Sequence, residues 1–225
     1  MYQTIGIICA MEKEFALIRE SLAGGHPEPM GRFTAYVGQS GDKTIIAAVS
    51  GIGKVNAAVC AQMMIWQYHA QAIINSGVCG ALDAGLHRMD IVLADELLYH
   101  DLEESHIRDD FPHCSRFHAD PQFNGLADSI CREEGVPCVH GRIVTGDAFI
   151  LDAQIKSAIA ARTGGIALEM EGAAVGHSCF LADIPFVVLR CVSDGIADSE
   201  LDYNAFAAQA ARRCAHLALR LAAQM

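Results

Sequence analysis

The hydrophobic positions of this chain recur in short blocks that alternate between two spacings. Residues 4–10 form a continuous apolar run rich in β-branched side chains, which predicts a buried strand. Directly after it, residues 11–22 place Phe15, Ile18 and Leu22 at helical spacing, which predicts a helix. The same change from strand to helix spacing repeats along the chain. The pattern therefore predicts alternating strands and helices.

We predict further strands over residues 32–37, 43–49, 72–75, 90–99, 136–145, 166–169 and 184–191, and further helices over residues 55–68, 121–134, 152–162, 172–181 and 204–223. Residues 76–81 contain two glycines and are predicted to form a turn, whereas the polar residues 100–118 are predicted to form a loop, at a subunit contact or over the site. Several strands are continuous Ile and Val runs, which is typical of a sheet covered on both faces. We therefore predict an α/β fold, a three-layer α/β/α sandwich with a central mixed β-sheet, in a single domain over residues 1–225.

Polar side chains interrupt the apolar pattern where several predicted strands end. Glu169 and Glu171 lie in an otherwise apolar run of small residues, and residues 190–195 follow another apolar run. Charged side chains are rarely buried without a partner or a ligand. Residues 11–14 and 146–149 also follow predicted strands, and ligands of α/β folds bind beyond the carboxyl ends of strands. We therefore expect these polar groups to face one cavity.

The composition limits the kind of partner. The chain has 225 residues, a formal net charge of −11 and a pI near 5.2. Nucleic acids and anionic membranes need a basic face, so we expect neither as a partner, and a small-molecule ligand instead. Residues 1–10 lack the Lys or Arg of a secretory signal, and no apolar run approaches the roughly 18 residues of a membrane helix. Nine scattered cysteines without a Cys-x-x-Cys pair are typical of reduced core cysteines, so we predict a cytoplasmic protein.

Several other motifs favour ordinary structural roles. Residues 51–54 (GIGK) lack the spacing of a phosphate-binding loop and fit a tight turn before a helix. His and Cys occur together at His113-Cys114, Cys138-Val139-His140 and His177-Ser178-Cys179, but none of these has a second pair at zinc-ligand spacing. We therefore predict no metal. A catalytic Cys–His pair stays open, although nine scattered cysteines single out no candidate.

Three acids, Glu14, Glu171 and Asp194, follow three different predicted strands. Taken singly, each would more often be a helix-start acid or a surface charge. Cleavage of a bond between a sugar and a heterocyclic base requires an acid for the leaving group, a base for water and hydrogen bonds to the sugar hydroxyls. The joint placement of the three acids at strand ends favours this chemistry.

Five short segments, taken together and in order, are similar to a known family. They are residues 6–14, 50–55, 146–150, 168–171 and 190–194. Over nearly its whole length the chain resembles the bacterial 5′-methylthioadenosine/S-adenosylhomocysteine nucleosidases, within the purine nucleoside phosphorylase-like superfamily. The resemblance implies a nucleoside phosphorylase-like fold, a nucleoside substrate, no cofactor, and a homodimer in which residues 100–117 complete the neighbour's pocket.

The resemblance also implies the reacting groups. Glu14 would be the base that activates water. Asp194 would protonate N7 of adenine, and Ser193 would help to place it. We expect burial beside other carboxylates to favour a protonated Asp194 near neutrality.

The remaining residues implied by the resemblance bind the substrate. The ring of Phe149 would stack on adenine, and backbone groups of Ile150 would form hydrogen bonds with the edge of the base. Glu171 and Met170 would hold the ribose hydroxyls. The other residues expected at the ribose or the apolar 5′ tail are Met11, Ile52, Val78, Glu169 and Tyr203.

Two positions favour hydrolysis over phosphorolysis. Related phosphorylases bind phosphate with an Arg just before a Gly-Ser-Cys-Gly turn and with the Ser of that turn, whereas this chain has Asn75 and Val78 there. A phosphate would lose a cation and a hydroxyl donor, and the Glu14 carboxylate would repel it. A water nucleophile suits these residues better.

Two departures from the family pattern concern the substrate. Val78 stands where the nucleosidases usually have Ser, and Glu104 stands where the partner loop usually presents an apolar residue. These changes leave room for an aminodeoxyfutalosine-type substrate. A purine nucleoside phosphorylase and a catalytically inactive nucleoside-binding protein also stay open as alternatives.

Overall fold

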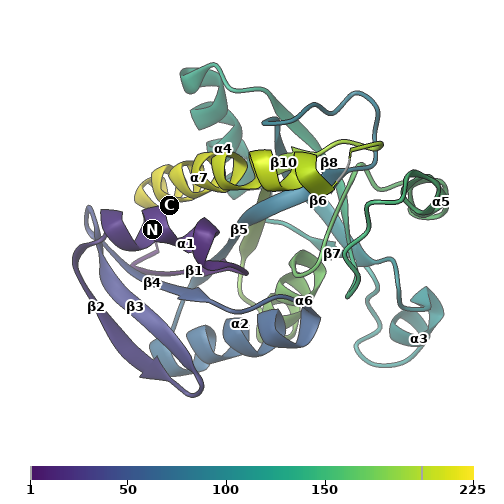
Figure 1. The fold of residues 1–225 in the computed structure, drawn as a ribbon. Helices are drawn as coiled ribbons and strands as arrows, with labels where there is room; N and C mark the ends of the chain where they lie inside the picture. Colours follow the sequence, from purple (N-terminus) through teal and green to yellow (C-terminus); the bar gives the residue numbers. More distant parts are fainter. Residues whose placement is uncertain (1, 199) are drawn as a thin grey trace.

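Strands and helices alternate along the chain in the computed structural model (Figure 1). The structure describes residues 2–198 and 200–225, apart from the side chain of Asp202; Met1 and Ser199, although within the expected domain, lie outside the described residues. In chain order the elements are β1 (Thr4–Cys9), α1 (Glu12–Ser21), β2 (Ala23–Met30), β3 (Phe33–Ser40), β4 (Lys43–Val49), α2 (Lys54–Tyr68), β5 (Ala72–Ala81), β6 (Ile91–Tyr99), α3 (Glu104–Asp109), β7 (Phe117–His118), α4 (Pro121–Glu134), β8 (Cys138–Thr145), α5 (Ala153–Thr163), β9 (Ala167–Glu169), α6 (Gly172–Ala182), β10 (Phe186–Asp194) and α7 (Glu200–Gln224).

The strands form one mixed sheet in the order β10-β6-β8-β9-β5-β1-β4-β3-β2. β1 is parallel to both β4 and β5, whereas β3 is antiparallel to β4 and β2 is antiparallel to β3. β10 pairs with β6 on one side and with β5 on the other. The pairings among β5, β10, β6, β8 and β9 therefore close a ring of five strands at one end of the sheet.

Helices cover both faces of this sheet (Figure 1). α2 and α6 pack on one face, where Met64 and Val175 join one apolar cluster with strand residues. α1, α4 and α7 pack on the other face in a second cluster, which includes Ile18, Ile130 and Leu221. Each such side chain contributes roughly 1.5–3 kcal/mol when it leaves water. The predicted α/β sandwich with a central mixed sheet is confirmed.

The sequence pattern missed β2, which lies at the edge of the sheet. This strand contains Pro27 and Pro29, and proline favours a loop in a sequence-based assignment. Proline is tolerated on an edge strand because one side of the strand has no partner that needs the missing N–H.

The turn predicted over residues 76–81 is wrong, because β5 continues through it to Ala81. Its two glycines serve close contacts with side chains and not a change of direction. A Cβ atom on Gly77 would lie 2.8 Å from Glu14 Oε1, and one on Gly80 would lie 2.8 Å from Asp194 Oδ2. The strand thus lets two carboxylates approach its backbone.

The loop predicted over residues 100–118 is also incomplete. It contains the short helix α3 and the short strand β7, which pairs with β6. Asp101, at its start, accepts hydrogen bonds from Lys54 Nζ at 2.7 Å and from the Asp147 N–H at 2.9 Å. The beginning of this segment is therefore tied to α2 and to the segment after β8.

Among the described residues, none of the helices combines the length and the apolar character needed to cross a membrane.

Candidate active site

A cavity of about 350 Å³ lies where β1, β5, β9 and β10 end. Ile52 and Phe149 on its wall are about half exposed, so the cavity opens to solvent beside them. The wall includes all of the residues proposed from the sequence, namely Met11, Glu14, Ile52, Val78, Phe149, Ile150, Glu169, Met170, Glu171, Ser193, Asp194 and Tyr203. The fold thus brings these residues together, and their individual roles remain predictions.

Glu14 is almost completely buried in the first turn of α1, directly after β1. Its Oε2 accepts hydrogen bonds from the N–H groups of Ala10 and Met11, both at 2.9 Å, and its Oε1 accepts one from the Val78 N–H at 3.1 Å. Burial raises the pKa of Glu14, while the Arg190 guanidinium and the backbone donors oppose the rise. A fixed carboxylate with an increased proton affinity suits a general base.

Asp194 is the last residue of β10, and its side chain is buried. Its Oδ2 accepts a hydrogen bond from Lys156 Nζ at 2.7 Å, and its Oδ1 accepts one from Ser193 Oγ at 2.8 Å. Lys156 has no exposed side-chain surface and also donates to the Gly195 carbonyl at 2.7 Å. The charged group in contact with Asp194 is therefore an ammonium, and not the carboxylates expected from the sequence.

Glu169 reaches the cavity wall, but its carboxylate is occupied by protein donors. Its Oε2 lies 2.5 Å from Arg190 Nη2 and accepts hydrogen bonds from the N–H groups of Glu171 and Gly172 at 2.9 and 2.7 Å. Its Oε1 accepts a hydrogen bond from the Thr145 hydroxyl. These contacts show that Glu169 holds Arg190 and the start of α6, and its expected contact with the substrate stays a prediction.

The carboxylate of Glu171 accepts fewer hydrogen bonds from the described residues than that of Glu169. Its Oε1 accepts a hydrogen bond from the Gly53 N–H at 2.9 Å, and its Oε2 lies 4.0 Å from Arg190 Nη2. Burial and the neighbouring Glu169 carboxylate raise the pKa of Glu171 to about 8, although Arg190 opposes the rise. Near neutrality Glu171 can therefore both donate and accept a hydrogen bond, which suits a pair of sugar hydroxyls.

Two aromatic rings form the apolar side of the cavity. Phe149 and Tyr203 meet edge to face, with 5.0 Å between the ring centroids. The Tyr203 hydroxyl accepts a hydrogen bond from Lys13 Nζ at 3.1 Å and lies 3.9 Å from the Met11 sulfur. The exposed ring of Phe149 offers a flat apolar face to a planar ligand.

The chain is similar to the members of a known family. A family model for the phosphorylase superfamily matches residues 4–223. The 5′-methylthioadenosine/S-adenosylhomocysteine nucleosidase of Treponema pallidum (strain Nichols) is 33% identical over an alignment of 251 residues, which covers 97% of this chain and 92% of the relative. The chain belongs to the 5′-methylthioadenosine/S-adenosylhomocysteine nucleosidase family. The resemblance found in the sequence is thus confirmed.

Solved structures agree with this assignment. The nucleosidase of Neisseria meningitidis in complex with methylthio-immucillin-A is 32% identical, with a TM-score of 0.93, and the match covers 99% of this chain and 100% of that one. The futalosine hydrolase of Helicobacter pylori strain 26695 is 28% identical, with a TM-score of 0.92, and covers 100% of this chain and 99% of that one. The nucleoside phosphorylase-like fold is therefore also confirmed.

Within this nucleosidase-family site, sequence reasoning missed Lys156 and the role of Arg190. Lys156 lies on the inward face of α5, three residues before the buried Ile159. A lysine at a core-facing helical position is a signal that the sequence did contain. Arg190 is 1% exposed and donates to Asn75 Oδ1 at 2.6 Å as well as to Glu169, so it neutralises the acids from behind the cavity.

The loop residue Glu104 is held within its own segment. Its Oε1 accepts hydrogen bonds from Ser115 Oγ at 2.9 Å and from Arg116 Nε at 3.2 Å. The Ser115 hydrogen bond is the main cause that lowers the pKa of Glu104. The charge at this position is thus partly satisfied by neighbouring loop residues.

Proposed function

We propose that this protein hydrolyses the N-glycosidic bond of 5′-methylthioadenosine and S-adenosylhomocysteine, releasing adenine and the 5′-thioribose product. The observation that carries the proposal is the placement of two buried carboxylates, Glu14 and Asp194, on the wall of one cavity. The similarity to nucleosidases of other bacteria supports the same reaction.

The charged groups suit a reaction in which one residue protonates the adenine leaving group and another takes a proton from water. Lys156 Nζ donates a hydrogen bond to Asp194 Oδ2 at 2.7 Å. In the proposed step one proton passes from this pair through Asp194 to N7, so that the electrons of the C–N bond leave with neutral adenine. Glu14 takes a proton from the water that bonds to C1′. Glu171 holds the ribose hydroxyls during the step. Exchange with solvent after product release returns the proton to Asp194 and Lys156 and removes the one on Glu14.

Internal hydrogen bonds support water over phosphate as the nucleophile. Asn75 uses its side chain to bind Arg190 and the Ile8 carbonyl, so it does not replace the phosphate-binding cation of the phosphorylases. Val78 offers only its N–H, which is donated to Glu14. An anionic nucleophile beside the Glu14 carboxylate would be repelled.

One set of incubations tests the proposal. The protein is mixed with methylthioadenosine, adenosylhomocysteine, adenosine and an aminofutalosine analogue, each with and without phosphate, and the products are identified by mass. We expect adenine and a free thioribose from the first two substrates at rates that do not depend on phosphate. A ribose 1-phosphate product would establish a phosphorylase instead, and tight binding of all four compounds without turnover would establish an inactive binding protein.

A futalosine-type substrate is the second candidate. It is favoured by the similarity to the Helicobacter pylori futalosine hydrolase and by Val78 and Glu104, which change the surroundings of the sugar and of the 5′ tail. A rate on the aminofutalosine analogue above that on methylthioadenosine would decide for it. Reversal of that preference by Val78→Ser would locate the cause at β5.

We also propose a cytoplasmic homodimer of single-domain chains, in which residues 100–117 complete the neighbour's pocket. Val55 and Trp66 on α2 are 74% and 70% exposed, and Phe180 and Leu181 on the adjacent α6 are about half exposed. A monomer rarely leaves such an apolar face in water. The family match over residues 4–223 supports a single domain, and the nine free cysteines support a cytoplasmic location.

A further inference from the structure

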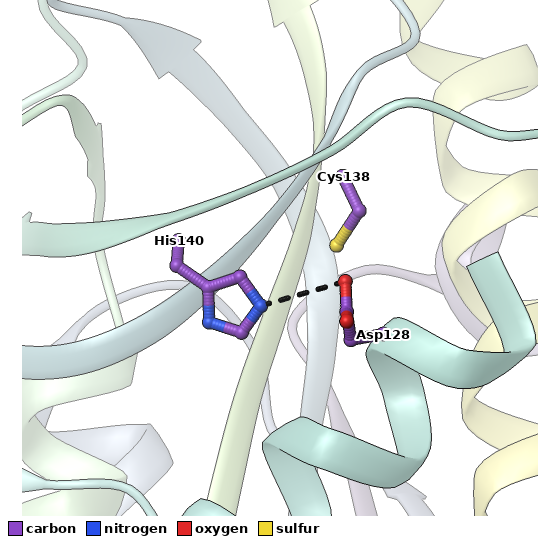
Figure 2. Close-up of side chains that lie close together, drawn as sticks. All are labelled: Asp128, Cys138 and His140. Atoms are coloured by element: carbon purple, nitrogen blue, oxygen red, sulfur yellow. Dashed lines mark ion pairs between the residues drawn. The ribbon is translucent and has the colours of Figure 1, made fainter. Parts of the chain in front are cut away.

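A second group of reactive side chains lies between α4 and the start of β8, at the end of β8 away from the cavity. Cys138 and His140 are two residues apart in β8, so their side chains project from the same face of the strand. Asp128, on α4, faces both of them (Figure 2). The ligand atoms of these three residues all lie within 4.8 Å of one another.

The spacing is close to that of a tetrahedral zinc site. With bonds of about 2.0–2.3 Å, the ligand atoms of such a site lie roughly 3.3–3.8 Å apart. The distance from His140 Nε2 to Asp128 Oδ1 is 3.7 Å, which already falls in this range. All three residues are partly or fully exposed, and the ligand atoms that lie up to 4.8 Å apart would have to approach by about 1 Å to reach this range.

A further carboxylate orients the imidazole. His140 Nδ1 lies 3.1 Å from Asp95 Oδ1, and that oxygen also accepts a hydrogen bond from Asn124 Nδ2 at 3.2 Å. Asn124 is buried and is fixed by the Ala94 carbonyl at 2.9 Å. A carboxylate on one ring nitrogen leaves the other, Nε2, free as a ligand, which is the usual arrangement around histidine ligands.

A second thiol lies beside the group. Cys131 is one turn after Asp128 on α4, and its thiol forms a hydrogen bond with that of Cys138. Two neighbouring thiols can bind a metal by releasing their protons. Thiolate and imidazole ligands select zinc over magnesium or calcium.

We propose that Asp128, Cys138 and His140 bind Zn²⁺, with the Cys131 thiolate or a water molecule as the fourth ligand. Arg132 Nη2 lies 2.9 Å from Asp128 Oδ2, so the carboxylate contributes its other oxygen to the metal. Cys138 begins β8 and Thr145 ends it, which separates this site from the cavity by roughly 23 Å along the strand. The metal is therefore structural: it ties α4 to the sheet and takes no part in glycosidic cleavage.

The test uses untagged, full-length protein that is stripped with a chelator under reducing conditions and then titrated with Zn²⁺ and, separately, with Co²⁺. We expect one equivalent to bind, a thiolate-to-cobalt charge-transfer band to appear, and saturating Zn²⁺ to raise the melting temperature by roughly 5–10 °C. Nucleosidase turnover should be the same with and without metal.

Matched variants locate the ligands. Cys138→Ser and His140→Gln should each lose the band and the thermal shift. Cys114→Ser and His26→Gln, which change a thiol and an exposed imidazole that do not line the hollow beside His140, should keep both. A weaker band in Cys131→Ser supports a two-thiolate site, and an unchanged band supports a water ligand. Absence of a thiolate band in the parent protein, or an unchanged band in Cys138→Ser, overturns the proposal. Melting without metal shows that each variant is folded.

Discussion

Replacement of Lys156 by Met removes one charge from a buried pair while keeping the length of the side chain. In the parent protein the ammonium is fully buried and donates to Asp194 Oδ2 and to the Gly195 carbonyl, both at 2.7 Å. The variant leaves the Asp194 carboxylate buried with the Ser193 hydroxyl as its one side-chain donor among the residues that the structure describes. Breaking a buried pair in this way costs about 3–5 kcal/mol, which for a chain of this size lowers the melting temperature by roughly 10 °C.

A double-mutant cycle measures the pair directly. Thermal and urea unfolding are compared for the parent protein, Lys156→Met, Asp194→Asn and the double variant. The double variant should lose less stability than the sum of the single variants, because a neutral amide leaves no buried charge without a partner. Additive losses, or a Lys156→Met variant that melts within about 2 °C of the parent protein, would refute the reasoning. Lys43→Met is the matched control, because Lys43 is similarly buried but its Nζ has no hydrogen-bond partner among the described residues and lies 3.7 Å from the exposed carboxylate of Asp42.

The same variant tests the proton path. Without Lys156, Asp194 must take its proton from solvent, so turnover should persist at acidic pH and fall more steeply than in the parent protein as the pH rises. The measurement is the pH profile of kcat for adenine release. A profile that keeps its shape would show that Lys156 stabilises the fold without supplying the proton.

The remaining predictions concern the base, the ribose contact and the dimer. Glu14→Gln should reduce the rate of hydrolysis at least a hundredfold with little loss of affinity for the substrate. A kcat near that of the parent protein would show that Glu14 is not the base. Burial raises the pKa of Glu171 from the ordinary value of 4.5 to about 8. The stabilisation that the protonated side chain gives to the folded state is therefore complete below pH 4.5 and is lost as the pH rises through 8. Glu171→Gln should therefore gain stability relative to the parent protein between pH 5 and about 9, and a constant difference in melting temperature would contradict this. Trp66→Glu should convert a dimer into monomers by light scattering and lower turnover, whereas a monomeric parent protein would contradict the proposed interface.

The sequence predicted the order of the elements well because apolar spacing alone decides between strand and helix in long segments. It failed where a local signal had a different cause. No strand was predicted around Pro27 and Pro29, which lie on an edge strand, and Gly77 and Gly80 indicated a turn but make room for Glu14 and Asp194. Both cases depend on neighbours that are distant in sequence, which no local pattern contains.

The candidate site also contains residues that the sequence predicted and partners that it missed. Most of the candidate residues follow strands whose ends meet at one cavity, a relation that a single sequence can express. Val78, within β5, and Tyr203, on α7, were implied only by the resemblance to the nucleosidases. The partners that set the charges of the site residues could not be found in this way. Lys156 meets Asp194 across 38 positions of sequence, and Asp128 meets Cys138 and His140 only because α4 packs on β8.

The ring of five strands has a consequence for motion. Within it, β10 pairs with β5 so that Cys191 lies opposite Val78 and Asp194 opposite Gly80, while β6 and β9 pair with the outer edges of these two strands. Amide protons at the centre of such a ring should exchange with solvent only when the whole sheet opens. The backbone that carries Asp194 and faces Glu14 should therefore keep its register while substrate enters and product leaves.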